Sequence, residues 1–271
     1  MVEEGRRSQR QADNRDAVGL AFQARAISAR GLSPKGNAEA RKLYDQALEI
    51  SPDYLLALIG RAYTDIVEDM FFHGTIPLDK AEQILVRALE IEPDNVSAKY
   101  TKAMLYYFKG DMDRTAFFAE QIIAIDPSYA PAYAALNRAR VAQGRATEAI
   151  ALEEKAIRLS PRDPFVDLWY QNLGATYLFL GRDEEAVPWM EKAIAMNDKV
   201  YFYHSSLASA YALTGRLDAA RKELEAATRL VPGLTIAKAA ASFRQSSSNE
   251  TYLKQADHYL AGLRLAGMPE N

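Results

Sequence analysis

The stretch LGATYLFLGRDEEAVPWMEKAI, residues 173–194, decides the fold of this chain. A small residue follows its first Leu, a Tyr lies three positions further on, and Gly181 interrupts the apolar pattern before Ala186, Met190 and Ala193. Apolar residues three and four positions apart share one face of a helix. The stretch therefore predicts two amphipathic helices that are joined by a turn at Gly181.

The same pattern recurs along the chain at a fixed interval. The glycines that follow the first helix of each pair are Gly110, Gly144, Gly181 and Gly215. The prolines that follow the second helix are Pro52, Pro93, Pro127, Pro161 and Pro232. Each series contains steps of 34 residues. Because two independent markers share one period, the chain is predicted to be an array of helix hairpins.

The residues around the turns have a physical role in ending and starting helices. An acidic residue just after the glycine, such as Asp111 or Asp183, can accept a hydrogen bond from the free N–H groups of the next helix. The proline at the far end of that helix removes the donor that a further turn would need. We therefore expect Asp111 and Asp183 to cap the second helices of their pairs.

Small residues set how closely the two helices of a pair can approach. They are Ala103, Gly174 and Ala208 on first helices, and Ala156, Ala193 and Ala227 on second helices. A single pair would leave an apolar face in water, so successive pairs must stack. The predicted architecture is a helical solenoid.

This pattern resembles the tetratricopeptide repeat (TPR). Residues 167–198 carry its signature residues at Tyr170, Leu173, Gly174, Tyr177, Ala186, Met190, Ala193 and Asp198. The resemblance implies an all-α fold, a right-handed α–α superhelical solenoid of about six hairpins. The expected units are 15–52, 55–93, 96–127, 130–161, 167–198 and 201–232.

The segments outside the repeats are expected to differ from them. Residues 1–14 are charged and are predicted to be flexible. Residues 233–271 hold two further helical stretches, separated by the polar SSSNE, and are predicted to cap the last apolar face of the solenoid.

Charge and composition exclude several classes of function. The chain has 33 Lys and Arg against 36 Asp and Glu, a formal net charge of −3, and no cysteine. No net positive field attracts nucleic acid or an acidic membrane, and the absence of cysteine fits a reducing compartment. The longest apolar runs are too short to span a bilayer. We expect a cytoplasmic protein that binds neither nucleic acid nor membrane.

Candidate catalytic residues are sparse in the sequence. The three histidines, His73, His204 and His258, lack the spacing of metal ligands, and His204 lies at a large-residue position that favours packing. Glycine-rich phosphate loops are absent from the sequence. The acidic pairs Glu153–Glu154 and Glu184–Glu185 are interpreted as solvated helix faces. We therefore expect a protein that is not an enzyme and that has no metal and no cofactor.

The TPR resemblance also implies a binding surface, because the first helices line the concave groove of such solenoids. The inward-facing positions by resemblance are Tyr63, Tyr100, Met104, Tyr107, Arg138, Gln171, Asn172, Ser205, Ser206 and Ser209. Such a groove suits an extended or helical peptide, with rings as anchors and polar groups as donors. The alternative, that these tyrosines pack between helices and that Arg138 is solvated or paired, stays open.

A narrower resemblance concerns most of the chain. Residues 21–62 and 164–194, together with the ending GLRLAGMPEN, resemble the TPR region at the C-terminal end of bacterial class III adenylate/guanylate cyclases and related multidomain regulators. This resemblance implies a sensory or scaffolding module that is attached to an output domain.

Three hypotheses of function follow from the sequence. The first is a non-catalytic scaffold that binds a protein or peptide in its groove, with self-association as an open question. The second is a bacterial signalling domain that senses a small ligand between the groove and the insertion at residues 68–80. The third, a catalytic subunit that uses scattered carboxylates, would require an organised acid–base pair.

Overall fold

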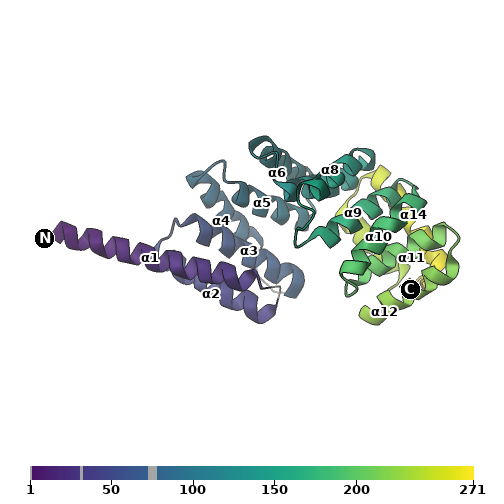
Figure 1. The fold of residues 1–271 in the computed structure, drawn as a ribbon, viewed down its shortest axis with the longest axis horizontal. Helices are drawn as coiled ribbons and strands as arrows, with labels where there is room; N and C mark the ends of the chain where they lie inside the picture. The colour runs from purple at the N-terminus through teal and green to yellow at the C-terminus, as the bar shows by residue number, and fades with distance from the viewer. Residues whose placement is uncertain (1, 31–32, 73–77) are drawn as a thin grey trace. The chain divides into compact units, whose positions relative to one another are not determined.

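The computed structural model of the chain describes residues 2–30, 33–72 and 78–271. All regular secondary structure in these ranges is α-helical (Figure 1). The chain divides into two compact units, Met1–Lys109 and Gly110–Asn271. The predicted all-α fold is therefore confirmed.

The first unit consists of helices that pack in sequential pairs. They are α1 (Val2–Ser28), α2 (Pro34–Ile50), α3 (Leu55–Phe72), α4 (Leu78–Ile91) and α5 (Val96–Phe108). Helix α1 packs on α2, α2 on α3, and α3 on α4. Helix α1 includes residues 2–14, so the flexibility expected for residues 1–14 stays a prediction.

Small residues hold the first unit together closely. A Cβ at Gly60 on α3 would overlap the ring of Tyr44 on α2, so only glycine allows this approach. Beside it, the fully buried Asp65 is paired with Arg61 and with Arg41, whose nitrogen lies 3.3 Å from the carboxylate. The buried carboxylate is thus compensated by two cations, as a charge in a protein interior requires.

The second unit contains the remaining helices of the described chain. They are α6 (Met112–Ile125), α7 (Ala130–Ala142), α8 (Ala146–Leu159), α9 (Val166–Phe179), α10 (Asp183–Met196), α11 (Tyr201–Leu213), α12 (Leu217–Leu230), α13 (Ile236–Ser246) and α14 (Glu250–Ala266). The pairs α7–α8, α9–α10 and α11–α12 correspond to the predicted hairpins 130–161, 167–198 and 201–232. The boundary at Gly110 lies within the predicted hairpin 96–127, so its two helices belong to different units.

The turns between paired helices follow the predicted chemistry with one correction. Gly144, Gly181 and Gly215 have φ angles of +75°, +69° and +80°, which side chains with a Cβ rarely adopt. Asp111 caps α6, accepting a hydrogen bond from the backbone N of Arg114 at 2.9 Å. The prediction for Asp183 is wrong: the N-cap of α10 is Arg182, and Asp183 is already the first helical residue.

Gly174 determines how closely α9 and α10 pack. A Cβ at this position would lie 2.7 Å from Cγ of Met190 and 3.1 Å from the carbonyl oxygen of Ala186. Both distances are shorter than ordinary van der Waals contact. The predicted role of Gly174 as a close-approach residue is therefore confirmed.

The helices expected in residues 233–271 are present as α13 and α14, and together we call them the C-terminal hairpin. Helix α14 packs along α11 and also contacts α9 and α12 (Figure 1). A simple cap would cover the second helix of the last repeat. The C-terminal hairpin instead also covers the first helices of two repeats.

Candidate functional site

The surface on which the C-terminal hairpin lies is the strongest candidate for a binding site. We call it the first-helix face and define it by Gln171 and Phe179 on α9 and by Ser206 and Ser209 on α11. All four side chains are buried beneath or beside α14. The second helices α10 and α12 pack on other sides of α9 and α11.

Aromatic rings form the centre of this contact. The ring of Phe179 stacks on Tyr252 of α14 with centroids 5.3 Å apart and lies 6.4 Å from Tyr259. Phe243 of α13 meets Phe179 edge-on at 5.7 Å and Tyr259 at 5.2 Å. Such offset and edge-to-face arrangements are favourable ring geometries. The cluster anchors both helices of the C-terminal hairpin to the first-helix face.

Hydrogen bonds fix the register of α14 on α11. Ser209 Oγ donates to the backbone oxygen of Tyr259 at 2.7 Å, and Ser206 Oγ lies 3.0 Å from the Tyr259 hydroxyl. Gln171 Nε2 donates to Ser206 Oγ at 2.6 Å and links α9 to the same network. Burial raises the pKa of Tyr259, so its phenol stays neutral.

A glycine in α14 allows the two backbones to approach. A Cβ at Gly262 would lie 2.6 Å from the backbone oxygen of Ser209 and 2.9 Å from Cδ1 of Leu213. A backbone atom cannot yield as the end of a flexible side chain can. Gly262 is therefore required for the observed docking of α14 on α11.

The hairpin is also tied to the turns of the repeats. Ser247 Oγ donates to the backbone oxygen of Ala142 at the end of α7, at 2.6 Å. His258 Nε2 lies 2.8 Å from Asp183 Oδ1 at the start of α10. Asp183 is thus used to hold α14 instead of capping α10, and the sequence offered no signal for this pairing across 75 positions.

The structure places the sequence-predicted site residues in two groups. In the second unit, Gln171, Ser205 and Ser209 are buried, Asn172 donates to Glu153 Oε1 at 3.2 Å, and Arg138 is half-buried. In the first unit, Tyr63 on α3 and the α5 residues Tyr100, Met104 and Tyr107 are half-buried. The helices α3 and α5 contact each other. Their role in binding stays a prediction.

Glu153 corrects the interpretation of the acidic pair Glu153–Glu154 as solvated. Its side chain on α8 is fully buried, while Glu154 remains partly exposed. Burial raises the pKa of Glu153 to about 8, opposed by the charge of Arg138 and the hydrogen bond from Asn172. The carboxyl therefore lies between α7 and α9, where two predicted groove residues meet it.

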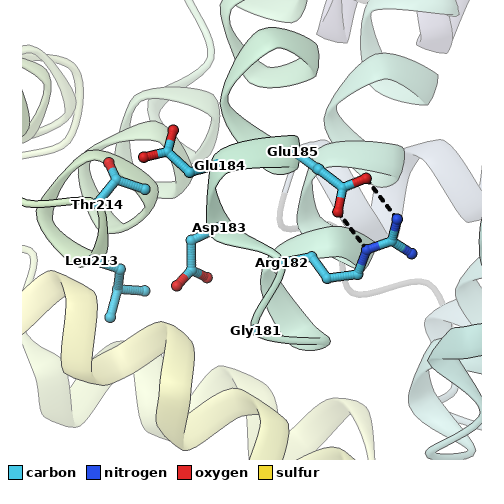
Figure 2. A pocket seen from close by; sticks show the side chains of 7 residues that line it. All are labelled: Gly181, Arg182, Asp183, Glu184, Glu185, Leu213 and Thr214. Atoms are coloured by element: carbon cyan, nitrogen blue, oxygen red, sulfur yellow. Dashed lines mark hydrogen bonds and ion pairs between the residues drawn. The ribbon is translucent and has the colours of Figure 1, made fainter.

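An open pocket of about 320 Å³ lies at the turns that precede α10 and α12 (Figure 2). Its lining residues are Gly181, Arg182, Asp183, Glu184, Glu185, Leu213 and Thr214. Each of its carboxylates has a basic partner: Asp183 meets His258 at 2.8 Å, Glu184 meets Arg216 at 2.6 Å, and Glu185 meets Arg182 at 2.6 Å. The hydrogen bond from Arg182 lowers the pKa of Glu185. The pocket is an ion-paired surface beside α14.

The histidines divide between packing and surface contacts. His204 is buried, with Nδ1 2.6 Å from Glu223 Oε2 and Nε2 3.1 Å from the backbone oxygen of Asp198. The expectation that it packs within its repeat is confirmed. His73 lies outside the described residues.

Two searches of the described residues bear on other classes of function. Within residues 2–30, 33–72 and 78–271, no helix has the length and apolar character needed to cross a bilayer. Within the same ranges, no cluster of three or more His, Cys, Asp or Glu side chains is arranged to hold a metal ion.

Comparison with known proteins supports the repeat architecture. Residues 130–199 and 203–232 match family models described as tetratricopeptide repeat. No curated protein matches the chain in sequence. The matched segments coincide with the hairpins α7–α8, α9–α10 and α11–α12.

Several solved structures share the fold at low sequence identity. The APC/C hetero-tetramer Cut9–Hcn1 has a TM-score of 0.72 at 16% identity, over 94% of this chain and 47% of that chain. PilF of Pseudomonas aeruginosa has a TM-score of 0.65 at 13% identity, over 82% of this chain and 95% of that one. A tetratricopeptide repeat protein from Parabacteroides merdae has a TM-score of 0.55 at 12% identity, over 93% and 99%.

These likenesses concern the fold alone, and the chain spans only 47% of the matched Cut9–Hcn1 chain. The helix pairs, the turn glycines and the family matches agree with one another. The protein is a helical-repeat protein of the tetratricopeptide type, with recognisable repeats in residues 130–199 and 203–232.

Proposed function

We propose that the chain is a non-catalytic protein-interaction module that binds a segment of another protein on the first helices of its repeats. The observation that carries this proposal is the docking of α14 on α9 and α11. Stacked repeats create extended surfaces that are commonly used for binding. Here such a surface already holds a helix, although the helix belongs to the same chain.

The chemistry of the first-helix face supports a helical ligand. Phe179 supplies a ring for stacking, and Ser206 and Ser209 supply hydroxyl groups. Recognition of an amphipathic helix by a groove uses anchors spaced at i, i+3, i+4 and i+7. Tyr252 and Tyr259 of α14 have the i, i+7 spacing and fill this role within the chain.

The first unit offers a second set of contacts for the same function. Tyr63, Tyr100, Met104 and Tyr107 place rings and a flexible thioether on neighbouring helices. Aromatic residues dominate the energetics of protein interfaces because they bury a large area. We propose these residues as anchors for a protein segment, and Arg138 and Asn172 of the second unit as polar contacts.

The alternative of a ligand-sensing or assembly domain in a nucleotide-cyclase-type signalling protein rests on sequence resemblance alone. It stays a prediction, as do the cytoplasmic location, self-association, and the expected absence of nucleic-acid, membrane and cofactor binding. Part of the insertion proposed to line its ligand pocket, residues 73–77, lies outside the described residues.

Site-specific photo-cross-linking in the cell of origin tests the proposed function. A benzophenone side chain is placed at Tyr100 or Tyr107 of the full chain, and at Val86 on α4 as the control in the same unit. We expect a discrete protein adduct from Tyr100 or Tyr107 and none from Val86, which is 41% exposed. Equal adducts at all three positions, or none at any, would count against the interaction module.

A further inference from the structure

The C-terminal hairpin has the properties of a detachable ligand. It is joined to the repeats through one short connection between α12, which ends at Leu230, and α13, which begins at Ile236. Its own ends bond to each other: the backbone N of Ile236 donates to Pro269 O at 2.8 Å, and that of Ala237 to Glu270 O at 3.0 Å. Arg264 adds an ion pair to Glu270 at 2.8 Å. The hairpin is thus internally bonded as a unit.

The buried side of α14 follows a regular helical pattern. Its residues are Tyr252, Ala256, Tyr259, Gly262, Leu263 and Ala266. Rings therefore lie at i and i+7, small residues at i+4, i+10 and i+14, and a leucine at i+11. These positions share one face of a helix. The pattern specifies which kind of helix the first-helix face accepts.

The fit between the hairpin and the repeats leaves polar groups unmatched. Gln171 Oε1 on α9 and Gln255 Oε1 on α14 are both buried and accept no hydrogen bond from the described residues. A buried acceptor without a donor weakens the contact in which it lies. A different helix that supplies a donor to Gln171 would gain an interaction that α14 does not make.

From these observations we propose that α14 is a displaceable occupant of the first-helix face, and that the partner is an amphipathic helix of the same pattern. This partner carries Tyr or Phe at i and i+7, Gly or Ala at i+4 and i+10, and a polar donor aimed at Gln171. The proposal rests on the proposed function and specifies its partner. Binding requires that α14 leave the face, because both helices need the same contacts with Phe179 and Ser209.

The occupied face makes a quantitative demand on any partner. A tethered helix competes at the high effective concentration that its short connection imposes, which is of millimolar order for flexible links. The apparent affinity for a partner is reduced in proportion to the fraction of chains whose face is open. Weakening the docking of α14 therefore increases affinity for a helix that is added in trans.

Gly262→Ala in the full chain weakens this docking selectively. The added Cβ meets the backbone oxygen of Ser209, while alanine favours the helical conformation of α14. The matched control is Gly19→Ala on α1, where a Cβ would meet nothing within 4 Å. The probe is a fluorescent peptide with the sequence NETYLKQADHYLAGLRLAG, residues 249–267. A second peptide with alanine in place of both tyrosines is the negative control.

We expect the peptide to bind the Gly262→Ala chain at least ten-fold more tightly than the wild type or the Gly19→Ala chain. The alanine peptide should bind none of them. Hydrogen exchange of the Gly262→Ala chain should show loss of protection in α14 and retained protection in α9 and α11, which verifies that the repeats are folded. Tyr259→Ala, which removes an anchor of α14 without a clash, should act in the same direction.

Three results would overturn the proposal. The first is equal peptide affinity for all chains, or no binding, while hydrogen exchange shows that α14 is released. The second is unchanged protection of α14 in the Gly262→Ala chain. The third is a dimer whose hairpins are exchanged between copies and that the peptide cannot dissociate, because the occupant would then be a second copy. These assays use purified components, so their failure is separate from failure of the cross-linking in cells.

Discussion

Glu153 is the buried carboxyl whose environment differs most from its unfolded surroundings. In water a glutamate of this chain would titrate near 4.5, whereas burial raises the pKa to about 8 in the fold. The folded state therefore binds the proton more tightly than the unfolded state. The contribution of the protonated carboxyl to stability is complete below pH 4.5 and is lost as the pH rises through about 8.

Glu153→Gln should remove this pH dependence, because glutamine keeps the size of the side chain and an acceptor for Asn172. The free energy of unfolding of the variant relative to wild type should increase between pH 4.5 and pH 8. At about 1.4 kcal/mol per pKa unit, the gain has an upper bound of about 5 kcal/mol. Chemical denaturation at a series of pH values measures it.

Glu154→Gln is the control for this prediction. Glu154 lies next to Glu153 and is paired with the exposed Arg158 at 3.5 Å. Its substitution should change stability by less than about 1 kcal/mol at every pH, as for most exposed ion pairs. A Glu153→Gln variant whose stability parallels wild type from pH 4 to pH 9 would show that the carboxyl is solvated.

Individual side chains were the part of the site that the sequence predicted least well. Glu153 and Glu154 are identical in type, yet only one faces the interior, because α8 rotates by about 100° per residue. The pairing of Asp183 with His258 depends on how α14 folds back. Asp111 was predictable because a cap involves only residues that are neighbours in sequence.

The turn glycines and helix glycines make opposite demands on the backbone. Gly215 has a φ of +80° and a Cβ there would meet nothing within 4 Å, so its conformation alone requires glycine. Gly19 lies in α1, where a Cβ would also meet nothing and the backbone is helical. The two positions therefore form a matched pair.

Gly215→Ala should destabilise the protein by about 1 kcal/mol, since a left-handed conformation is strained for alanine. Gly19→Ala should stabilise α1 by about 0.5–1 kcal/mol, because alanine is the better helix former. Thermal and urea denaturation of the two variants beside wild type measure both effects. If both substitutions shift stability in the same direction, this assignment of the two backbones is wrong.

Gly174→Ala tests the packing of the α9–α10 pair. The new methyl group would press against Met190 Cγ and the Ala186 carbonyl, so overpacking should cost about 1–3 kcal/mol. The midpoint of urea denaturation reports the loss. A variant as stable as wild type would mean that Met190 moves aside freely and that the glycine does not set the spacing.

Helix pairs were predictable from the sequence because their period, turn glycines and prolines are local signals. The matched repeats at residues 130–199 and 203–232 coincide with the expected hairpins. The helices of residues 233–271 were also expected. Their placement was not, because an amphipathic helix shows that one face is covered without showing what covers it.

The whole chain combines a surface that binds helices with a helix that occupies it. The groove positions Gln171, Ser205 and Ser209 were expected to be open to a partner, and they are buried in the structure. A partner gains access to them only when α14 leaves. The sequence did contain a sign of this arrangement, since Tyr252, Tyr259 and Leu263 form an apolar stripe on the last helix.

Hydrogen exchange of the unmodified full chain, with and without the peptide of residues 249–267, tests this arrangement most directly. In saturating peptide, we predict that the chain's own α14 amides, from Tyr252 to Ala266, lose protection while those of α9 and α11 keep it. Isotope labelling of the chain distinguishes its α14 from the identical added sequence. If α14 keeps its full protection, or if α9, α11 and α14 exchange together as one unit, α14 is a permanent part of the core and the first-helix face is no binding site.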